Sequence, residues 1–258
     1  MSALLDQAWR DLLAVSPPLM HSGFFFLLVA SSVTLAVNLF FSLLDGCTGR
    51  VPPRVLGEAS LTLLSGFVPF ILMWVFQWNV VTVSLPVRAP TAWQFATQFF
   101  TCLVLGDACH YLTHRALHTP FLRRHIHHVH HDYEGHLFSW IGAQVHPVEA
   151  VAINGAIYWP FLVFAHPMVL WFMAVVATVN ATVAHSGYDG GVFQLGNWLP
   201  FGLTTDDHQL HHDVNATKNF GNVLSVWDRL GGTYGTGGPF KALSIWEVVL
   251  NDVKIRRL

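Results

Sequence analysis

The sequence contains few charged residues. Asp, Glu, Lys and Arg together make up 11% of its 258 residues, less than half of the roughly 25% found in typical soluble domains. The mean hydropathy is +0.45. The formal net charge is −2 and there is no extended tract of Lys and Arg, so the sequence lacks the kind of surface that binds nucleic acid. This composition indicates a protein that lies in a membrane.

Cysteine is also scarce. The chain has three cysteines, Cys47, Cys102 and Cys109, which are scattered and odd in number. They predict neither a disulfide framework nor a zinc knuckle. A metal site in this chain would therefore take its ligands from other side chains.

Long stretches without charged residues fill the first part of the chain. Residues 19–44 and 59–87 are each long enough to cross a bilayer, and residues 89–106 are about long enough for a third span. Residues 45–58 are polar and contain Gly and Pro, which predicts a loop between the first two spans. Residues 1–18 contain charges and prolines and predict a short interfacial or capping segment.

Histidine is abundant, and its spacing is regular. Eight of the sixteen histidines lie within residues 107–131, and a second group follows about eighty residues later. On a helix, residues spaced i, i+3 and i+4 share one face. Three sets have this spacing: His110 and His114; His127, His130 and His131; His208, His211 and His212. Neutral imidazoles are common ligands of iron, zinc and copper, so the three sets predict a shared metal site.

The last two sets can meet only if the chain returns to the same side of the membrane. Residues 150–188 contain no charged residue, and Pro160 and Pro167 interrupt this stretch. A single span would place the third set on the opposite side of the bilayer. We therefore expect a helical hairpin with two short legs.

The distribution of Lys and Arg predicts the orientation of this arrangement. Eleven of these residues lie on the histidine side, against Arg10 and Arg88 on the other side. By the positive-inside rule, the histidine side faces the cytosol.

At this point the motifs resemble a known family. His110-x-x-x-His114, His127-x-x-His130-His131 and His208-x-x-His211-His212, in this order, resemble the three histidine boxes of the fatty acid hydroxylase/sterol desaturase superfamily. Shorter elements within about residues 90–235 agree with it: Asp107, Arg115, His146-Pro147-x-Glu149, His185-Ser186-Gly187-Tyr188, Asn219-Phe220-Gly221 and Trp227-Asp228-Arg229-Leu230 with Gly232-Thr233. The short chain, the element at 185–188 and the element at 227–233 are most similar to the cholesterol 25-hydroxylase-like branch.

The resemblance implies a function and its requirements. Members of the superfamily use two non-haem iron ions and O2 on unactivated C–H bonds of lipids, with cytochrome b5 and its reductase as electron donors. They are multi-pass proteins of the endoplasmic reticulum membrane. We expect a sterol monooxygenase that hydroxylates cholesterol at C25. The alternatives are a sterol or fatty-acyl desaturase, a C4-methylsterol oxidase and, from a different class, a metal transporter. A transporter would carry ionisable residues along its spans, and these spans have few.

The resemblance and the spacing together predict the metal ligands. The eight box histidines would supply four ligands to each metal, and His185, just after the hairpin, would be the ninth. The predicted site residues are His110, His114, His127, His130, His131, His185, His208, His211 and His212.

For the remaining histidines and nearby carboxylates, the sequence predicts roles other than those of the nine predicted ligands. His118 is expected to support or cap rather than bind metal, because Pro120 soon ends that helix. His125 and His128 point away from the box face and are expected at the surface. Two roles are possible for Asp107, His146 and Asp207: each could cap a helix or form a hydrogen bond to a ligand imidazole. Asp189 is a candidate oxygen ligand.

The predicted fold is all-α. Residues 1–258 would form a single polytopic membrane bundle of about three spans plus a hairpin, with a cytosolic histidine-rich dimetal cap. Its parts are the membrane spans in 1–106, the first two boxes in 107–140, the membrane hairpin in 141–188, and the third box with the C-terminal cap in 189–258.

The orientation makes a testable prediction about glycosylation. The sequons Asn180-Ala-Thr182 and Asn215-Ala-Thr217 should both stay unmodified in eukaryotic cells, the first because it lies in the membrane and the second because it faces the cytosol. Electrophoretic mobility before and after glycosidase treatment checks this. A glycan on Asn215 would place the histidine side in the lumen.

Overall fold

A computed structural model describes residues 2–15, 20–21, 25–48, 85–133, 137–213, 217–238 and 241–245. Within these residues the chain is mostly helical, as the sequence predicts. The α-helices are α1 (Ser2–Val15), α3 (Phe25–Thr48), α5 (Ala92–Leu117), α6 (Pro120–His125), α7 (Pro147–Phe164), α8 (Pro167–Ala184), α9 (Thr205–His212) and α10 (Val226–Leu230). Short 3-10 helices are η1 (His127–Val129), η2 (Ser139–Ala143), η3 (Gly191–Phe193) and η4 (Leu195–Trp198).

Helices α7 and α8 form the predicted hairpin. Both begin with a His-Pro pair: proline suits the first turn of a helix because its missing N–H would have no partner there. The Nδ1 atoms of His146 and His166 accept hydrogen bonds from the backbone N–H of Val148 (3.2 Å) and Met168 (3.1 Å), which caps each helix start. The turn falls at residues 165–166, and Pro160 lies inside α7 rather than at the turn.

Three described helices are long and apolar enough to cross a membrane: Phe25–Gly46 of α3, Pro147–Phe164 and Pro167–Ala184. The first corresponds to the span expected at 19–44, and the other two are the legs of the hairpin. The span expected at 59–87 lies almost entirely outside the described residues.

The third expected span, 89–106, is not among these helices. The chain instead forms α5, a single helix that starts at residue 92 and runs on to Leu117. Polar residues such as Gln98 make α5 less apolar than the three candidate spans. Gln98 Oε1 also accepts the backbone N–H of His166 at 2.9 Å, which ties α5 to the hairpin turn. Helix α5 thus serves as a packed partner of the hairpin that extends into the histidine region.

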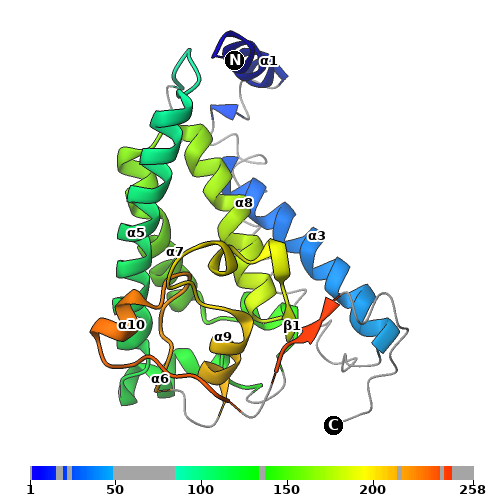
Figure 1. The fold of residues 1–258 in the computed structure, drawn as a ribbon, viewed down its shortest axis with the longest axis vertical. Helices are drawn as coiled ribbons and strands as arrows, with labels where there is room; N and C mark the ends of the chain where they lie inside the picture. The colour runs from blue at the N-terminus through cyan, green and yellow to red at the C-terminus, as the bar shows by residue number, and fades with distance from the viewer. Residues whose placement is uncertain are drawn as a thin grey trace.

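The core of the bundle joins α5 to both legs of the hairpin. Phe99, Cys102 and Leu103 of α5 pack with Phe161 of α7 and Met173 of α8, and all five are at most 6% exposed. In Figure 1 the helices α3, α5, α7 and α8 run between two ends of the molecule, with α1 at one end and α6, α9 and α10 at the other. All histidine boxes therefore lie at the same end.

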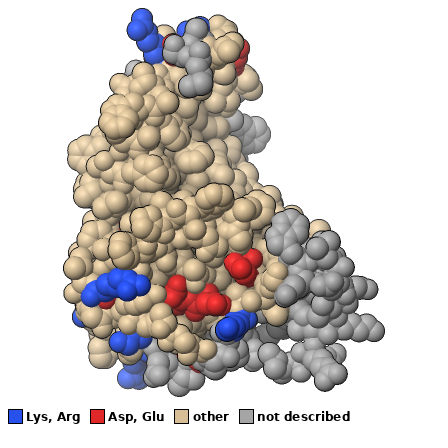
Figure 2. Space-filling view, in the orientation of Figure 1, with Lys and Arg blue, Asp and Glu red and all other residues tan. Residues whose placement is uncertain are grey.

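The described charged residues lie at the two ends of the molecule on the face in Figure 2. Blue and red residues appear near the α1 end and around the histidine end, and the described surface between them carries none. Six of the eleven Lys and Arg assigned to the histidine side are described: Arg115, Arg123, Arg124, Lys218, Arg229 and Lys241. This apolar belt is the surface expected of a bundle within a bilayer.

A small element of sheet departs from the all-α expectation. Strand β1 (Tyr188–Asp189) pairs in parallel with β2 (Leu243–Ser244), with Tyr188 opposite Leu243. Tyr188 is fully buried, and its hydroxyl donates to Asp45 Oδ1 of α3 at 2.9 Å. These contacts attach the chain that follows α8 to the end of α3.

The close approach of α5 to α7 gives a stability prediction. A Cβ at Gly106 would lie 2.5 Å from the backbone oxygen of Ile157, whereas a Cβ at Gly155 would meet nothing within 4 Å. Gly106→Ala should force the helices apart and destabilise the fold by about 1–3 kcal/mol. The matched control Gly155→Ala should stabilise it by up to about 1 kcal/mol, because alanine favours a helix. Thermal unfolding in lipid nanodiscs measures both, and equal shifts for the two variants would refute the close contact.

Candidate metal centre

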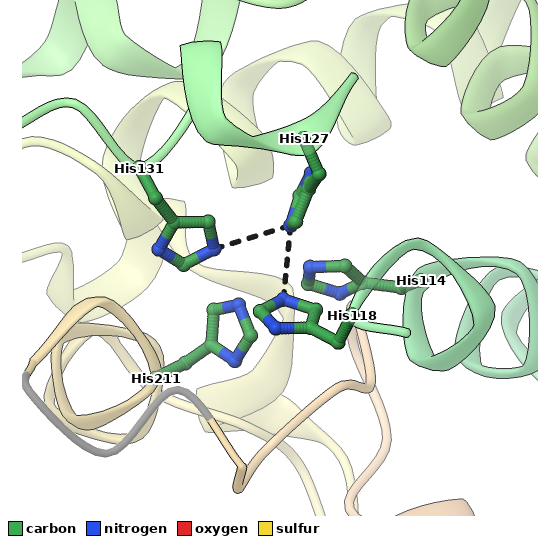
Figure 3. Close-up of side chains that lie close together, drawn as sticks. All are labelled: His114, His118, His127, His131 and His211. Carbon is green, nitrogen blue, oxygen red and sulfur yellow. Dashed lines mark hydrogen bonds between the residues drawn. The ribbon is translucent and has the colours of Figure 1, made fainter. Parts of the chain in front are cut away.

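Nine buried or partly buried histidines form two adjacent groups. Group A consists of His114, His118, His127, His131 and His211. Group B consists of His130, His185, His208 and His212. Within each group, one ring nitrogen from every residue lies within 4.8 Å of the others. Figure 3 shows the five rings of group A pointing toward one another.

The elements deliver these side chains in i, i+4 pairs. His114 and His118 come from the end of α5, and His208 and His212 from α9. Each pair serves one group, because residues four apart on a helix share a face. His127 and His131 likewise both belong to group A, whereas His130 between them belongs to group B.

The second box departs from the predicted geometry. The sequence predicts a helix with His127, His130 and His131 on one face. The structure instead has helix α6 ending at His125, followed by the 3-10 turn η1 and further turns. The tighter turn separates the rings, so one box contributes to both groups.

In group A, His127 is the central residue. Its Nε2 lies 2.9 Å from Nε2 of His118 and 3.1 Å from Nε2 of His131 (Figure 3). Its Nδ1 lies 2.7 Å from Glu149 Oε1. A carboxylate accepts the N–H of Nδ1, and in the tautomer that binds metal Nε2 then directs its lone pair toward the other rings.

Group B has the same design around His185. Its Nδ1 donates to the backbone oxygen of Ala181 at 2.7 Å, which leaves Nε2 bare. That Nε2 lies 2.8 Å from Nε2 of His208 and 3.2 Å from Nε2 of His130. Nε2 of His212 lies 3.2 Å from Nε2 of His208.

These nitrogen sets fit metal ions. Nitrogens bound about 2.1 Å from one ion lie about 3–4 Å from each other, in agreement with the spacing in both groups. A single bare lone pair cannot accept two N–H donors well, yet the central Nε2 of each group has two close nitrogen neighbours. In addition, Nε2 of His211 is buried without a hydrogen-bond partner. A cation at the centre of each group would satisfy these lone pairs.

Burial keeps these imidazoles in the form that binds metal. Loss of hydration lowers the pKa of His118 to about 3, of His131 to about 2 and of His185 to about 4. Burial, together with neighbouring imidazoles, also holds the pKa of His208 and His212 well below the usual range. These five rings are therefore neutral at pH 7, as ligation requires.

Eight of the nine predicted site residues lie in the two groups, and His118 takes the place predicted for His110. His110 belongs to neither group; it lies one turn before His114 on α5, with the ring centroids 5.3 Å apart. His118, which the sequence interpretation set aside, lies in group A. Pro120 forces only Thr119 into an extended conformation (φ −64°, ψ 148°), and His118 keeps a near-helical backbone (φ −80°, ψ 0°). The overlapping spacing His114-x-x-x-His118 was the available signal.

The other candidates have structural roles. His125 and His128 are exposed, as expected. His146 caps α7, and Asp207 completes the capping box of α9 with Thr204. Asp107 binds no histidine: it accepts the backbone N–H of Val223 and Leu224 at 2.8 and 3.1 Å. Asp189, the candidate oxygen ligand, is exposed, and its Oδ1 accepts the backbone N–H of Gly191.

Glu149 is a functional residue that the sequence interpretation quoted without assigning a role. It lies in the first turn of α7 and is 2% exposed. A carboxylate that accepts the second N–H of a ligand histidine fixes the ring orientation and tautomer. Glu149 therefore orients the central imidazole of group A.

Residues 218–224, which we call the carbonyl loop, orient two further rings of group A. The backbone oxygens of Lys218 and Phe220 lie 2.8 and 2.9 Å from Nδ1 of His211 and His114. Asn219 between them has a positive φ of 56°, which asparagine tolerates better than most residues. Its side chain binds Gly235 through N–H and C=O groups.

Asp228 holds the carbonyl loop in place. Its carboxylate is fully buried and accepts the backbone N–H of Phe220 and Gly221, both at 2.8 Å, and the hydroxyl of Thr233 at 2.7 Å. Asp107 holds the loop from the other side through Val223 and Leu224. Two buried carboxylates thus fix the carbonyls that orient His114 and His211.

The fold and the site define a helical membrane-type protein with two adjacent, all-imidazole candidate metal sites. Residues 99–233 match the fatty acid hydroxylase family, and the chain belongs to this family. Its place in the fatty acid hydroxylase/sterol desaturase superfamily, predicted from the histidine boxes, is confirmed.

Several curated proteins are similar to the chain. Methylsterol monooxygenase 1 from Danio rerio is 34% identical over 140 residues, which are 54% of this chain and 47% of the relative. Methylsterol monooxygenase erg25B from Aspergillus fumigatus is 32% identical over 183 residues, 67% of this chain and 60% of the relative. Very-long-chain aldehyde decarbonylase GL1-11 from Oryza sativa subsp. indica is 33% identical over 167 residues, 64% of this chain and 61% of the relative. The chain therefore spans about half to three-fifths of these relatives. No solved structure matches it.

The exchange of His110 for His118 can be tested directly. His118→Ala should lower the metal bound per chain, because it removes a nitrogen from group A, while His110→Ala should leave the metal content close to that of the parent protein. Removal of an orienting partner typically costs about 10–100-fold in metal affinity, and loss of a ligand should cost more. Elemental analysis of purified protein measures both variants, with the exposed His128→Gln as the control. Metal loss in His110→Ala alone would restore the sequence-based assignment.

The carbonyl loop predicts a selective effect of Asp228. Asp228→Asn turns one acceptor into a donor that faces a backbone N–H, so Phe220 and the His114 ring should shift. Metal affinity should fall by about 10–100-fold at one of the two sites, whereas Asp189→Asn, an exposed control, should bind as the parent protein does. Competition titration with a chelating dye resolves the two sites. Equal loss at both sites would mean that Asp228 acts on the fold as a whole.

Proposed function

We propose that this protein is a metal-dependent oxidoreductase that uses O2 to oxidise a C–H bond of a sterol, with two non-haem iron ions held by groups A and B. One observation carries the proposal: two all-imidazole sites lie together at the end of an apolar helical bundle. The family membership and the methylsterol monooxygenases among its relatives support it.

The donor set is compatible with iron. Imidazole suits iron as well as zinc and copper, and only a redox-active metal fits oxidation of an aliphatic C–H bond. When bound, two iron ions would supply the activation of O2 and the oxidising equivalents. The balanced reaction consumes the C–H compound, O2, two electrons and two protons, and it yields an alcohol and water.

The residues of the chain have defined tasks in this reaction. The nine imidazoles would hold the ions, and burial excludes bulk water from most of these rings. Glu149 and the backbone oxygens of Ala181, Lys218 and Phe220 keep the proton on Nδ1 of their histidine partners and direct Nε2 inward. This fixed orientation would hold the ligand nitrogens in position for the ions.

The substrate is expected to be a lipid, because the sites adjoin the membrane helices. The methylsterol monooxygenase relatives favour a sterol, and a methyl group on the sterol ring competes with C25 of cholesterol as the position oxidised. The likeness to the cholesterol 25-hydroxylase-like branch stays a prediction. The aldehyde decarbonylase relative supports a second candidate, the conversion of a long-chain aldehyde.

Location and electron supply belong to the same proposal. The cluster of Lys and Arg at the histidine end supports a cytosolic active site, and the resemblance to the superfamily supports residence in the endoplasmic reticulum membrane. Cytochrome b5 and its reductase would then deliver the two electrons from the cytosolic side.

Product analysis with labelled oxygen tests the proposal. Protein reconstituted with ferrous iron, cytochrome b5 and reductase should add one atom of ¹⁸O from ¹⁸O₂ to cholesterol or to a 4-methylsterol. Mass spectrometry identifies the sterol and the position. His128→Gln should keep this activity, because the residue is exposed, whereas His130→Ala should abolish it. An unlabelled, dehydrogenated product would show a desaturase, and turnover of a long-chain aldehyde alone would favour the second candidate.

A further inference from the structure

The segment between α8 and α9 exposes large apolar side chains that the metal centre does not use. Residues 190–205 contain no charged residue and lie between Asp189 and Asp206. Four side chains within this segment are more than half exposed: Val192 62%, Phe193 62%, Trp198 67% and Phe201 62%. Such a concentration of exposed apolar groups marks an interaction surface. We call residues 190–203 the apolar loop.

The apolar loop folds back along a membrane-type helix. The backbone N–H of Leu195 donates to Asn180 Oδ1 at 3.1 Å. Asn180 lies four residues before the end of α8, so this contact is about 6 Å inside the candidate span. Leu195 and Leu199 pack against the core shared by α5, α7 and α8. In Figure 1 the yellow chain after α8 accordingly turns back toward the middle of the bundle before α9 begins.

The polar groups of the apolar loop are largely satisfied from within. The backbone N–H groups of residues 193, 194, 197 and 202 all donate to backbone oxygens three residues earlier. The indole N–H of Trp198 donates to the backbone oxygen of Val192 at 3.0 Å, and the side-chain amide of Asn197 to that of Gly191 at 2.9 Å. Irregular backbone can enter a lipid environment only when its hydrogen bonds are made in this way.

Tight glycine packing makes the apolar loop a fixed shape. A Cβ at Gly196 would overlap the backbone oxygen of Leu203, and a Cβ at Gly202 would overlap that of Gly196. The middle of the loop therefore presses directly against its C-terminal end. The exposed side chains are presented by a rigid support.

We infer that the apolar loop is seated in the bilayer at the level of the headgroups and upper acyl chains, on the side of the metal centre. The continuity of its surface with the uncharged belt in Figure 2 identifies phospholipid as the partner. Trp, here Trp198, favours this interface. On this inference, residues 190–203 lie in the membrane interface, whereas the sequence alone predicts a cytosolic cap over the whole of residues 189–258. The inference does not depend on which reaction the metal centre performs.

The position of the apolar loop in the bilayer also determines where group B lies. His208, a member of group B, follows the apolar loop by five residues, and His185 precedes it by five. A loop anchored in lipid therefore holds group B close to the membrane surface, within reach of a substrate that remains partly in the bilayer.

Depth-dependent fluorescence quenching tests the inference. The full-length, metal-loaded protein, with Cys47, Cys102 and Cys109 replaced by Ala, receives a single cysteine through Val192→Cys or Phe193→Cys and is labelled with bimane. It is reconstituted in phosphatidylcholine nanodiscs. The quenchers are nitroxide-bearing phosphatidylcholine in the lipid and iodide in the water. Leu162→Cys on the exposed side of α7 is the lipid control, and the exposed Arg124→Cys is the water control.

The three outcomes are distinct. We expect labels at positions 192 and 193 to be quenched by the nitroxide lipid to nearly the extent seen at position 162, and little by iodide. Quenching by iodide to the extent seen at position 124 would overturn the inference. Protection from both quenchers would also overturn it and would show that protein, either a second copy or a partner, covers the loop. Metal content of each labelled protein confirms that it is folded.

Discussion

The structure depends on two hydrogen bonds that fix the protons of two imidazoles. Nδ1 of His127 is held by Glu149 at the start of α7, and Nδ1 of His185 by Ala181 at the end of α8. Both partners lie on the hairpin at its open end, away from the turn at residues 165–166. Each bond leaves a bare Nε2 at the centre of one group, and the other rings gather around it. The hairpin is therefore the support of the metal centre as well as a membrane element.

The rest of the site is built onto this support from distant parts of the chain. Helix α5 brings His114 and His118 alongside α7, where Gly106 permits a close approach. The carbonyl loop then closes over the rings of His114 and His211 and is itself held by Asp107 and Asp228. Asp107 and Asp228, which contact no metal-site nitrogen, thus determine the orientation of the His114 and His211 rings through the carbonyl loop.

Much of this arrangement could be predicted from the sequence, and the failures have physical causes. Spacing and charge predicted a hairpin, because two histidine sets separated by an uncharged stretch must meet on one side. Spacing could not choose between His110 and His118, since both lie four residues from His114 and only tertiary packing shows which ring faces the site. The split of the second box depends on a 3-10 turn that periodicity does not reveal. The role of Glu149 required the contact between α7 and η1, which no local pattern encodes.

Crystallography with anomalous scattering at the iron edge tests the central claim, that the nine imidazoles form two separate metal sites. The account predicts two iron peaks, one within bonding distance of His114, His118, His127, His131 and His211, and the other within bonding distance of His130, His185, His208 and His212. A single peak, or a peak that His110 binds in place of His118, would contradict it.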